Sequence, residues 1–317
     1  MQIDYCLILA AGFGTRMGSI GQKVPKVLWP VFEKSLLELQ VAYARSLGVK
    51  KIFINLHNMG EAIELHCNNN PRFEGVKFLW ERPEILDIGG AIHNLASQDE
   101  VNYQGRLLVL NADQFFYLQP DVLQSLLSPL KDEASVLFTY KVNSSDGYNG
   151  LEIDPEGKIR AIIKNQDIPR NSAIPTYTGI SLIDLSKLNK VPGISKFFDS
   201  VCLLASGTCH SVLLEGIDYW DFGTVKRYWE SMFRILETYR THSMHPFLRF
   251  LVNERAMKSW KINLQTMSYF AKSPRVINLS AEEVVQDLGP SIILSRGRLE
   301  SRTLPTVWWN EIMEEVK

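Results

Sequence analysis

The most informative stretch of the sequence lies near the N-terminus. It is Leu7-Ile8-Leu9-Ala10-Ala11-Gly12-Phe13-Gly14-Thr15-Arg16-Met17, followed by Pro25-Lys26. An apolar run enters a turn that holds two glycines, and such a run is typical of a buried strand. Glycine lets backbone N–H groups approach an anion closely. Because Arg16 and Lys26 add two positive charges, the stretch predicts a polyphosphate site at the end of a buried strand.

Two well-known phosphate loops do not fit this stretch. A P-loop would continue with Gly-Lys-Ser or Gly-Lys-Thr, and the dinucleotide fingerprint requires a small residue where Met17 stands. The stretch instead resembles the signature of sugar-1-phosphate nucleotidyltransferases, Leu-Ala-Ala-Gly-x-Gly-Thr-Arg-Met followed by Pro-Lys-x-Leu, which lies here at Leu9–Met17 and Pro25–Leu28. The alternative interpretation is a glycine turn with solvated charges.

Composition places the chain among ordinary globular proteins. It has 317 residues, of which 45% are hydrophobic and 22% charged, with a net charge of −1. We therefore expect neither nucleic acid nor a membrane as a partner, and no apolar run is long enough to span a bilayer. Four cysteines without metal-ligand spacing predict free thiols in a reducing compartment, so the expected location is cytoplasmic.

Apolar β-rich runs alternate with helical patterns along the first half of the chain. Strands are predicted at 51–56, 76–80, 106–111 and 135–140, and helices at 35–47, 59–67, 89–96 and 120–130. This alternation argues for an α/β fold with a parallel sheet covered on both faces. The resemblance implies a Rossmann-like, mixed and mainly parallel sheet flanked by helices, which is GT-A-like and covers residues 1 to about 235.

The last part of the chain differs from the first half in its pattern of apolar residues. We expect a nucleotidyltransferase domain at 1–240 and a C-terminal extension with helical and β character at 241–317. Its loosely spaced apolar residues are Ile292, Leu294, Leu299, Leu304 and Val307. They favour either a degenerate left-handed β-helix or small β cap, or irregular packing against the main domain. A homo-oligomer through this extension is a further expectation.

Two aspartates are candidates for a metal site. Asp113 directly follows a predicted strand, and ligands in open α/β sheets lie beyond the carboxyl ends of strands. Asp221 lies in Tyr219-Trp220-Asp221-Phe222-Gly223-Thr224, which resembles the family pattern Trp-x-Asp-x-Gly-Thr. The resemblance implies that both hold Mg²⁺, which usually takes one or two protein carboxylates. Alternatively, either aspartate caps a helix.

The remaining site residues come from the resemblance. The stretch Glu84–Ile92 resembles the turn that approaches the nucleotide base, where glycines allow close backbone contact; the alternative is an ordinary strand-to-helix turn. The implied nucleotide-binding residues are Leu9, Ala10, Ala11, Gly12, Gly14, Thr15, Arg16, Lys26, Glu84, Gly89, Gly90 and Asn111. The implied sugar-phosphate-binding residues are Gly150, Lys164, Thr178 and Gly179, although Ile163 precedes Lys164 where the family usually has glutamate.

The resemblance implies a Mg²⁺-dependent reaction of a nucleoside triphosphate with a sugar 1-phosphate, giving a nucleoside diphosphate sugar and pyrophosphate. The sugar phosphate attacks the α-phosphate in line, and the catalytic residues are Arg16, Lys26 and Asp113. Arg16 would bind the β- and γ-phosphates and Lys26 the α-phosphate.

The nucleotide and the sugar are less clearly indicated. Asn55-Leu56-His57 resembles the mannose-1-phosphate guanylyltransferase and N-acetylmuramate-1-phosphate uridylyltransferase branches. Glu81 or Glu84 would offer hydrogen-bond acceptors to guanine, which favours GTP and a mannose-like sugar 1-phosphate. The alternatives are UTP with an N-acetylmuramate-like sugar 1-phosphate, a CTP-dependent phosphocholine-type cytidylyltransferase, and a catalytically dead regulatory homologue.

Overall fold

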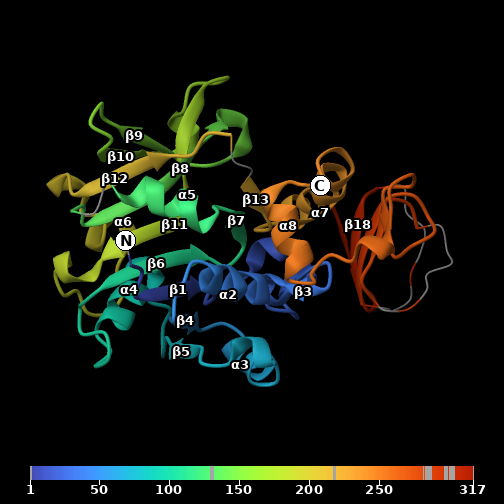
Figure 1. Cartoon of the computed structure of the whole chain (residues 1–317), viewed down its shortest axis with the longest axis horizontal. Coiled ribbons are helices and arrows are strands. Elements are labelled where there is room, and N and C mark those ends of the chain that lie inside the picture. Colours follow the sequence, from blue (N-terminus) through green and yellow to red (C-terminus); the bar gives the residue numbers. More distant parts are fainter. Residues whose placement is uncertain are drawn as a thin grey trace. The chain divides into compact units, whose positions relative to one another are not determined.

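The structure, a computed structural model, describes residues 2–128, 132–216, 219–280, 282, 288–295, 299 and 304–316 (Figure 1). The chain forms two compact units. The first contains Met1–Gly12 and Tyr43–Tyr219, and the second contains Phe13–Ala42 and Trp220–Lys317. Each unit therefore combines segments that are distant in the sequence.

A seven-stranded sheet is the centre of the first unit. Its strand order is β12-β8-β11-β6-β1-β4-β5, and all neighbours are parallel except β11, which is antiparallel to both β6 and β8. The strands are β1 (Tyr5–Leu9), β4 (Lys51–Leu56), β5 (Lys77–Trp80), β6 (Arg106–Asn111), β8 (Ser135–Asn143), β11 (Ala173–Asp184) and β12 (Cys209–Leu213). The predicted mixed, mainly parallel sheet is confirmed.

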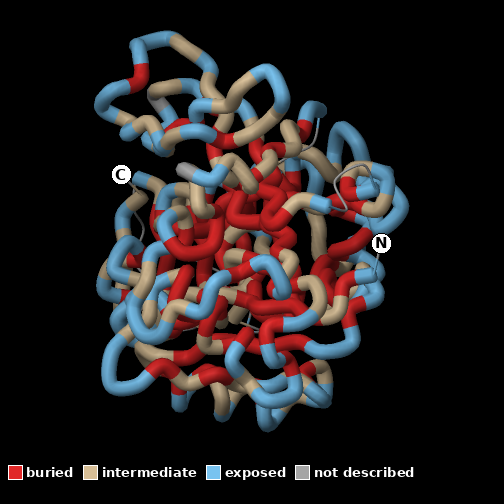
Figure 2. The backbone as a smooth tube through the Cα atoms, turned by 90° about the vertical axis from the view of Figure 1, so that its left-hand side faces the viewer, coloured by how far each residue is buried: buried red, intermediate tan, exposed pale blue. Residues whose placement is uncertain are grey.

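Helices cover this sheet because its strands are apolar on both faces. Leu7 of β1 and Val109 of β6 belong to a buried cluster with Ile92 and Leu95 of one covering helix, and Figure 2 shows such buried segments gathered in the interior. The helices of the chain are α1 (Gly18–Gly21), α2 (Leu36–Ser46), α3 (Gly60–Asn68), α4 (Asp87–Ala96), α5 (Pro120–Leu127), α6 (Phe197–Ser200), α7 (Val225–Thr241) and α8 (Pro246–Asn253). The predicted end of α5 at 129–130 lies outside the described residues.

Short strands complete the first unit. A hairpin is formed by β9 (Gly150–Ile153) and β10 (Ile159–Ile163), which pair in antiparallel fashion. Strand β7 (Gln114–Phe116) lies outside the large sheet, and so does β13 (Tyr219–Asp221), of which only Tyr219 belongs to the first unit. The four cysteines are free and buried, as expected for thiols in a core.

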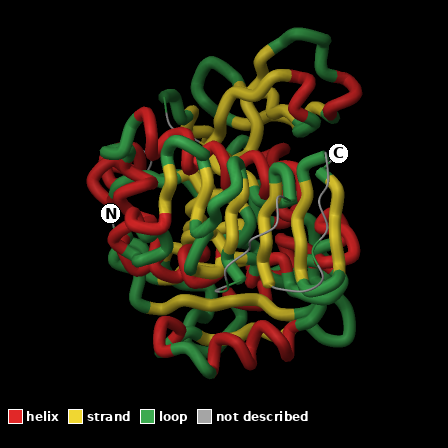
Figure 3. Tube along the Cα trace, turned by 90° about the vertical axis from the view of Figure 1, so that its right-hand side faces the viewer, coloured by secondary structure: helices red, strands yellow, loops and turns green. Residues whose placement is uncertain are grey.

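The second unit holds a six-stranded sheet at the C-terminal end of the chain (Figure 3). Its central strands stack in parallel, with Ile277, Ile292 and Val307 in register at intervals of 15 residues. The strands are β14 (Ile262–Asn263), β15 (Ser268–Tyr269), β16 (Val276–Asn278), β17 (Ser291–Ser295), β18 (Thr306–Trp309) and β19 (Ile312–Glu315). The segment 242–273, which has helical character in the sequence, contains α8 and then these first short strands.

A small hairpin ties the N-terminal segment of the second unit to this sheet. Strands β2 (Pro30–Val31) and β3 (Lys34–Ser35) are joined by Phe32 and Glu33. The ring of Phe32 packs edge-on against Tyr269, with centroids 4.8 Å apart. The Glu33 carboxylate accepts hydrogen bonds from Lys261 Nζ at 2.7 Å and from the Tyr269 hydroxyl at 2.9 Å.

Lys258 Nζ completes the partners of Glu33 at 3.2 Å. Burial raises the pKa of the Glu33 carboxyl, but the hydrogen bonds from Lys261, Tyr269 and Lys258 outweigh it and hold the pKa below its ordinary value. A lowered folded-state pKa means stabilisation that is present at neutral pH and is lost as the pH falls below about 4.

We predict that Glu33→Gln destabilises the protein by about 1–2 kcal/mol at pH 7, because two ammonium groups lose their anionic partner. The difference from wild type should shrink as the pH falls below about 4. Urea unfolding at pH 7 and at pH 3.5 measures both effects. Glu237→Gln is the control, since Glu237 is half-exposed and pairs with the equally accessible Arg240; a loss as large as that of Glu33→Gln would contradict the prediction.

Candidate active site

The carboxyl ends of the parallel strands β1, β4, β5 and β6 share one edge of the first unit's sheet, where ligands of open α/β sheets bind. A chain of hydrogen bonds joins three of these ends. Asn55 Oδ1 accepts from the Ala10 N–H at 2.7 Å, and Asn55 Nδ2 donates to Glu81 Oε1 at 2.7 Å. Glu81 Oε2 then accepts from the Leu86 N–H at 2.7 Å.

This chain of hydrogen bonds, which we call the edge network, is buried. Asn55 is 4% exposed and Glu81 1% exposed. The orientation of the Asn55 amide is unambiguous, because the Ala10 N–H can only donate and the carboxylate accepts. His57 adds a contact between its Nδ1 and the Glu81 carbonyl at 2.9 Å. The network fixes the start of the glycine turn after β1 and the turn before α4 to each other.

The end of β6 contacts the antiparallel strand β11. Asn111 Nδ2 donates to Gln114 Oε1 at 3.0 Å, and a Cβ added to Gly179 would lie 2.4 Å from that Asn111 nitrogen. Gly179 also has φ +82° and lies where the β11–β8 register shifts, so a side chain is excluded on two grounds. The structure thus brings together Asn111 and Gly179, two residues expected to contact the substrates.

Other expected sugar-phosphate residues lie along the same strands and the hairpin. Thr178 is buried, and its hydroxyl donates to the Phe138 carbonyl at 2.9 Å. Gly150 is buried against the Ile174 side chain, and it pairs with Ile163, so the exposed Lys164 follows at the same end of the hairpin. Gly150 and Lys164 are therefore adjacent, while the Thr178 hydroxyl is engaged by the sheet.

Gly89 and Gly90 pack closely against a later segment of the chain. A Cβ at Gly89 would lie 2.6 Å from the Ser195 carbonyl oxygen, and one at Gly90 would lie 2.5 Å from that of Gly193. Packing of the segment on α4 therefore requires both glycines, whatever their contact with a base. Glu84, in contrast, is exposed.

The second unit contains the rest of the signature, residues 13–26, which we call the glycine loop. Gly14 adopts φ +64°, and its carbonyl accepts from the Met17 N–H at 2.9 Å, which closes a tight turn. Met17 is fully buried, whereas Thr15 and Arg16 are exposed and Lys26 half-buried. The turn thus anchors the loop by Met17 and leaves Arg16 on the surface of its unit.

The last strand of the second unit contacts this loop. Glu314 of β19 accepts hydrogen bonds from the backbone N–H and the hydroxyl of Ser19 through Oε1, and a Cβ at Gly18 would collide with its carboxylate. Ser19 lies three residues after Arg16. A residue far away in the sequence therefore fixes the loop, and no sequence pattern near either residue indicates this.

Asp221 has partners within the second unit. Its Oδ1 accepts from the Gly223 N–H at 2.7 Å, and its Oδ2 pairs with Arg227 Nη1 at 2.9 Å. The sequence did not single out Arg227, although it lies in the first turns of the helix that follows the motif. Each carboxylate oxygen has two lone pairs, so these contacts leave acceptor capacity for a cation.

Each of the two aspartates, taken within its own unit, offers a ligand type that suits a magnesium ion. Asp113 is 8% exposed and Asp221 6% exposed, and carboxylate oxygens are the ligands that Mg²⁺ prefers. Within the described residues, no group of three or more His, Cys, Asp or Glu side chains is placed so that it could hold a metal ion. Mg²⁺ commonly takes one or two protein carboxylates with substrate phosphates, so such a cluster is not needed.

Comparison with known proteins identifies the family. The model of the "MobA-like NTP transferase domain" matches residues 6–167, just over half of the chain. The chain belongs to this family. Its members bind nucleoside triphosphates and sugar phosphates and generally use a divalent metal ion. The expected membership of a nucleotidyltransferase family is thereby confirmed.

Individual relatives agree with this assignment. The bifunctional protein GlmU of Synechococcus sp. (strain CC9311) is 30% identical over 188 residues, which are 58% of this chain and 39% of that protein. A bifunctional sugar-1-phosphate nucleotidylyltransferase/acetyltransferase of Sulfurisphaera tokodaii is 25% identical over 167 residues, which are 53% of this chain and 38% of that protein. The chain thus spans less than half the length of these relatives.

A solved structure has the same fold. HddC from Yersinia pseudotuberculosis, complexed with GMP-PN, superimposes with a TM-score of 0.60 at 22% identity, covering 73% of this chain and 99% of HddC. No described helix of the present chain combines the length and apolar character needed to cross a membrane.

We predict that Asn55→Leu destabilises the protein by about 3 kcal/mol, because Oε1 of the buried Glu81 carboxylate and the Ala10 N–H both lose their hydrogen bond to Asn55. In a double-mutant cycle, Asn55→Leu with Glu81→Leu should be less destabilising than the two single effects added, by about 1–3 kcal/mol. Urea unfolding measures all three variants. Asn69→Leu, at an exposed position, should change stability by less than about 0.5 kcal/mol, and strict additivity of the pair would contradict the network.

We also predict that Glu314→Ala increases the rate of tryptic cleavage after Arg16 or Lys23 about fivefold, because the glycine loop opens locally when it loses its acceptor. Peptide mass spectrometry locates and times the cuts under native conditions. Glu315→Ala is the matched control, since the neighbouring side chain points to the other face of the strand. Equal cleavage rates in wild type and Glu314→Ala would show that Glu314 does not hold the loop.

Proposed function

We propose that the protein is a sugar-1-phosphate nucleotidyltransferase that converts a nucleoside triphosphate and a sugar 1-phosphate into a nucleoside diphosphate sugar and pyrophosphate. The observation that carries the proposal is the Leu9–Lys26 signature. Its first part follows β1, an inner strand of the mixed, mainly parallel sheet that family membership leads one to expect. The relative named as a sugar-1-phosphate nucleotidylyltransferase supports the substrate class.

In the proposed reaction an oxygen of the sugar phosphate forms a bond to the α-phosphorus. The bond between that phosphorus and the oxygen bridging to the β-phosphate breaks, and pyrophosphate leaves. This chemistry depends on positioning and on neutralisation of charge rather than on a covalent intermediate. Arg16 binds the β- and γ-phosphates, and Lys26 stabilises the negative charge that develops at the α-phosphate.

Asp113 and Asp221 would hold a Mg²⁺ ion, which supplies charge neutralisation and orientation of phosphate oxygens. Arg227 holds one oxygen of Asp221 and thereby orients this carboxylate. Gly179 leaves room beside Asn111 for a substrate group, and Lys164 offers an exposed ammonium to a phosphate monoester.

For the nucleotide we propose GTP, with a mannose-like sugar 1-phosphate. Glu81 is unsuited to accept hydrogen bonds from the base, because both its oxygens already accept hydrogen bonds within the edge network. The exposed Glu84 keeps the proposed role of accepting from the guanine N–H groups. The occurrence of a guanine nucleotide analogue in HddC, which shares the fold, agrees with this choice.

The test is pyrophosphate release from each of the four ribonucleoside triphosphates with mannose 1-phosphate, N-acetylmuramate 1-phosphate and phosphocholine. We expect the highest kcat/KM with GTP and mannose 1-phosphate. A preference for UTP with N-acetylmuramate 1-phosphate would correct the specificity, and turnover of CTP with phosphocholine alone would contradict the sugar substrate. No pyrophosphate from any pair would indicate a catalytically inactive homologue.

We predict that Asp113→Asn lowers kcat/KM by about 100-fold or more at ordinary Mg²⁺ concentration, because a carboxylate that neutralises charge at the reacting phosphates is lost. Pyrophosphate release with the preferred pair measures the loss. Asp121→Asn, at an exposed position in the first turn of α5, is the control and should leave kcat/KM unchanged. Near-wild-type activity of Asp113→Asn would contradict the assigned role.

A further inference from the structure

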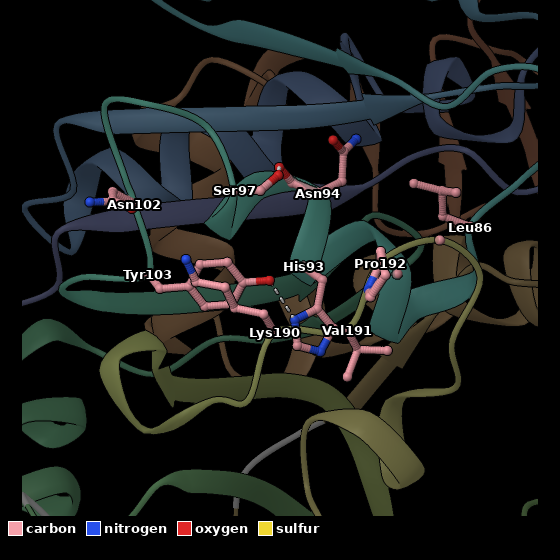
Figure 4. Close-up of a pocket in the computed structure, with 11 residues that line it drawn as sticks. Leu86, His93, Asn94, Ser97, Asn102, Tyr103, Lys190, Val191 and Pro192 are labelled. Atoms are coloured by element: carbon pink, nitrogen blue, oxygen red, sulfur yellow. Dashed lines mark hydrogen bonds between the residues drawn. The ribbon is translucent and has the colours of Figure 1, made fainter.

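A cavity of about 440 Å³ lies beside α4 in the first unit (Figure 4). Its volume falls within the range of small-molecule sites. One wall is the face of α4 and its preceding residue that carries Leu86, Gly90, His93 and Ser97, which follow one another at intervals of three or four residues. Among the residues expected to bind the nucleotide, Gly90 alone borders this cavity.

The opposite wall is the segment 190–193, which is attached to the unit at both ends. At one end the Gly90 N–H donates to the Ser195 carbonyl at 3.0 Å, and the Ser195 N–H donates to the Leu86 carbonyl at 3.1 Å. At the other end the Tyr103 hydroxyl is hydrogen-bonded to the backbone of Val191, and Lys190 Nζ lies 5.3 Å from the centre of the Tyr103 ring. The two attachments hold the walls apart, so the cavity is preformed.

Between the walls, His93 and Tyr103 form a fixed pair. His93 Nε2 faces the Ser200 carbonyl at 3.3 Å, and because a carbonyl only accepts, Nε2 carries a proton. Burial lowers the pKa of His93, so the ring is neutral and its Nδ1 accepts from the Tyr103 hydroxyl at 3.0 Å. The polar atoms of both side chains are hydrogen-bonded within the protein, so mainly their ring surfaces border the cavity.

The charge of the remaining lining favours an anion. Lys190 carries the one formal charge among the lining residues, none of which is acidic. Asn94, Ser97 and Asn102 supply amide and hydroxyl groups, while the Tyr103 ring and Pro192 supply apolar surface (Figure 4). A few polar groups on a largely apolar wall are typical of sites for small organic molecules. We infer that this cavity binds a small organic anion with a flat ring, its charge at Lys190 and its ring against Tyr103.

Such a ligand would contact the edge network. Leu86 lines the cavity, its N–H donates to Glu81, and its carbonyl accepts from Ser195. An occupant that shifts Leu86 changes the turn before α4 and thus the edge of the sheet where the triphosphate binds. This part of the inference rests on the proposed function: the ligand is an effector that alters nucleotide affinity.

The site itself is tested without nucleotide. Phenyl phosphate is the probe, with inorganic phosphate as its charge-only counterpart and benzyl alcohol as its ring-only counterpart, each titrated calorimetrically into the full chain. We expect phenyl phosphate to bind at least tenfold more tightly than either counterpart. Lys190→Ala should weaken it about three- to tenfold, whereas Lys196→Ala, at an exposed position outside the cavity, should leave it unchanged.

A second variant guards against binding elsewhere. Asn94→Trp fills the cavity from the surface of α4 and should abolish the binding of phenyl phosphate, with a thermal midpoint close to that of wild type. Failure of phenyl phosphate to bind, or binding that neither Lys190→Ala nor Asn94→Trp weakens, would overturn the site.

The effector role has its own measurement. The preferred triphosphate should change the affinity of the protein for phenyl phosphate. Phenyl phosphate should change the affinity for that triphosphate by the same factor, because coupling between two sites is reciprocal. Equal affinities in a protein that binds both would overturn the effector role and leave the proposed reaction intact. Loss of pyrophosphate release from every substrate pair, with phenyl phosphate binding retained, would instead overturn the proposed function and keep the site.

Discussion

A buried carboxylate constrains the edge of the sheet from which the proposed chemistry starts. Glu81 is almost fully removed from water, and a polar group buried in that way requires hydrogen bonds to both its oxygens. Asn55 and the Leu86 N–H provide them, and Asn55 can do so only while its own oxygen accepts from Ala10. The positions of three strand ends are thus interdependent, and the turns that follow β1 and precede α4 inherit their geometry from this requirement.

In the second unit, too, segments that are distant in the sequence hold each other in place. Its glycine loop and hairpin belong to the N-terminal part of the chain, yet Glu33 binds Lys261 and Tyr269, and Ser19 binds Glu314. An aromatic contact adds to this, because Trp29 packs edge-on against Tyr228 of α7 with centroids 5.0 Å apart. The C-terminal sheet therefore stabilises the segment that carries Arg16 and Lys26.

The sequence predicted the parts of this protein that depend on local patterns. The apolar run at 106–111 predicted its strand closely, and the periodic pattern at 35–47 predicted the helix that the structure has at Leu36–Ser46, since burial leaves a periodic trace in the sequence. The family signature is likewise a local pattern, and it predicted a nucleotide loop at Leu9–Lys26. The order of the strands was not predicted, because the resemblance implied only that the sheet is mixed and mainly parallel.

The sequence did not predict contacts between residues that are distant from each other in the chain. Nothing near Glu81 shows that its carboxylate is buried between Asn55 and Leu86, and nothing near Glu314 shows that it binds Ser19. The glycines at 89 and 90 illustrate a different limit: the pattern indicated a close backbone approach but could not show that the segment 193–196 makes it. The pairing of Asp221 with Arg227 likewise depends on the rotation of α7 after the motif.

The contact between Ser19 and Glu314 also bears on how the protein is made. The two residues are 295 positions apart in the chain. At ordinary elongation rates of about 5–20 residues per second, the loop emerges roughly 15–60 seconds before its acceptor exists. For most of that interval the segment also lacks Lys258, Lys261 and Tyr269, the partners of Glu33. A fusion partner attached close behind β19 would similarly be carried next to the glycine loop, so the position of an affinity tag matters for any measurement of this protein.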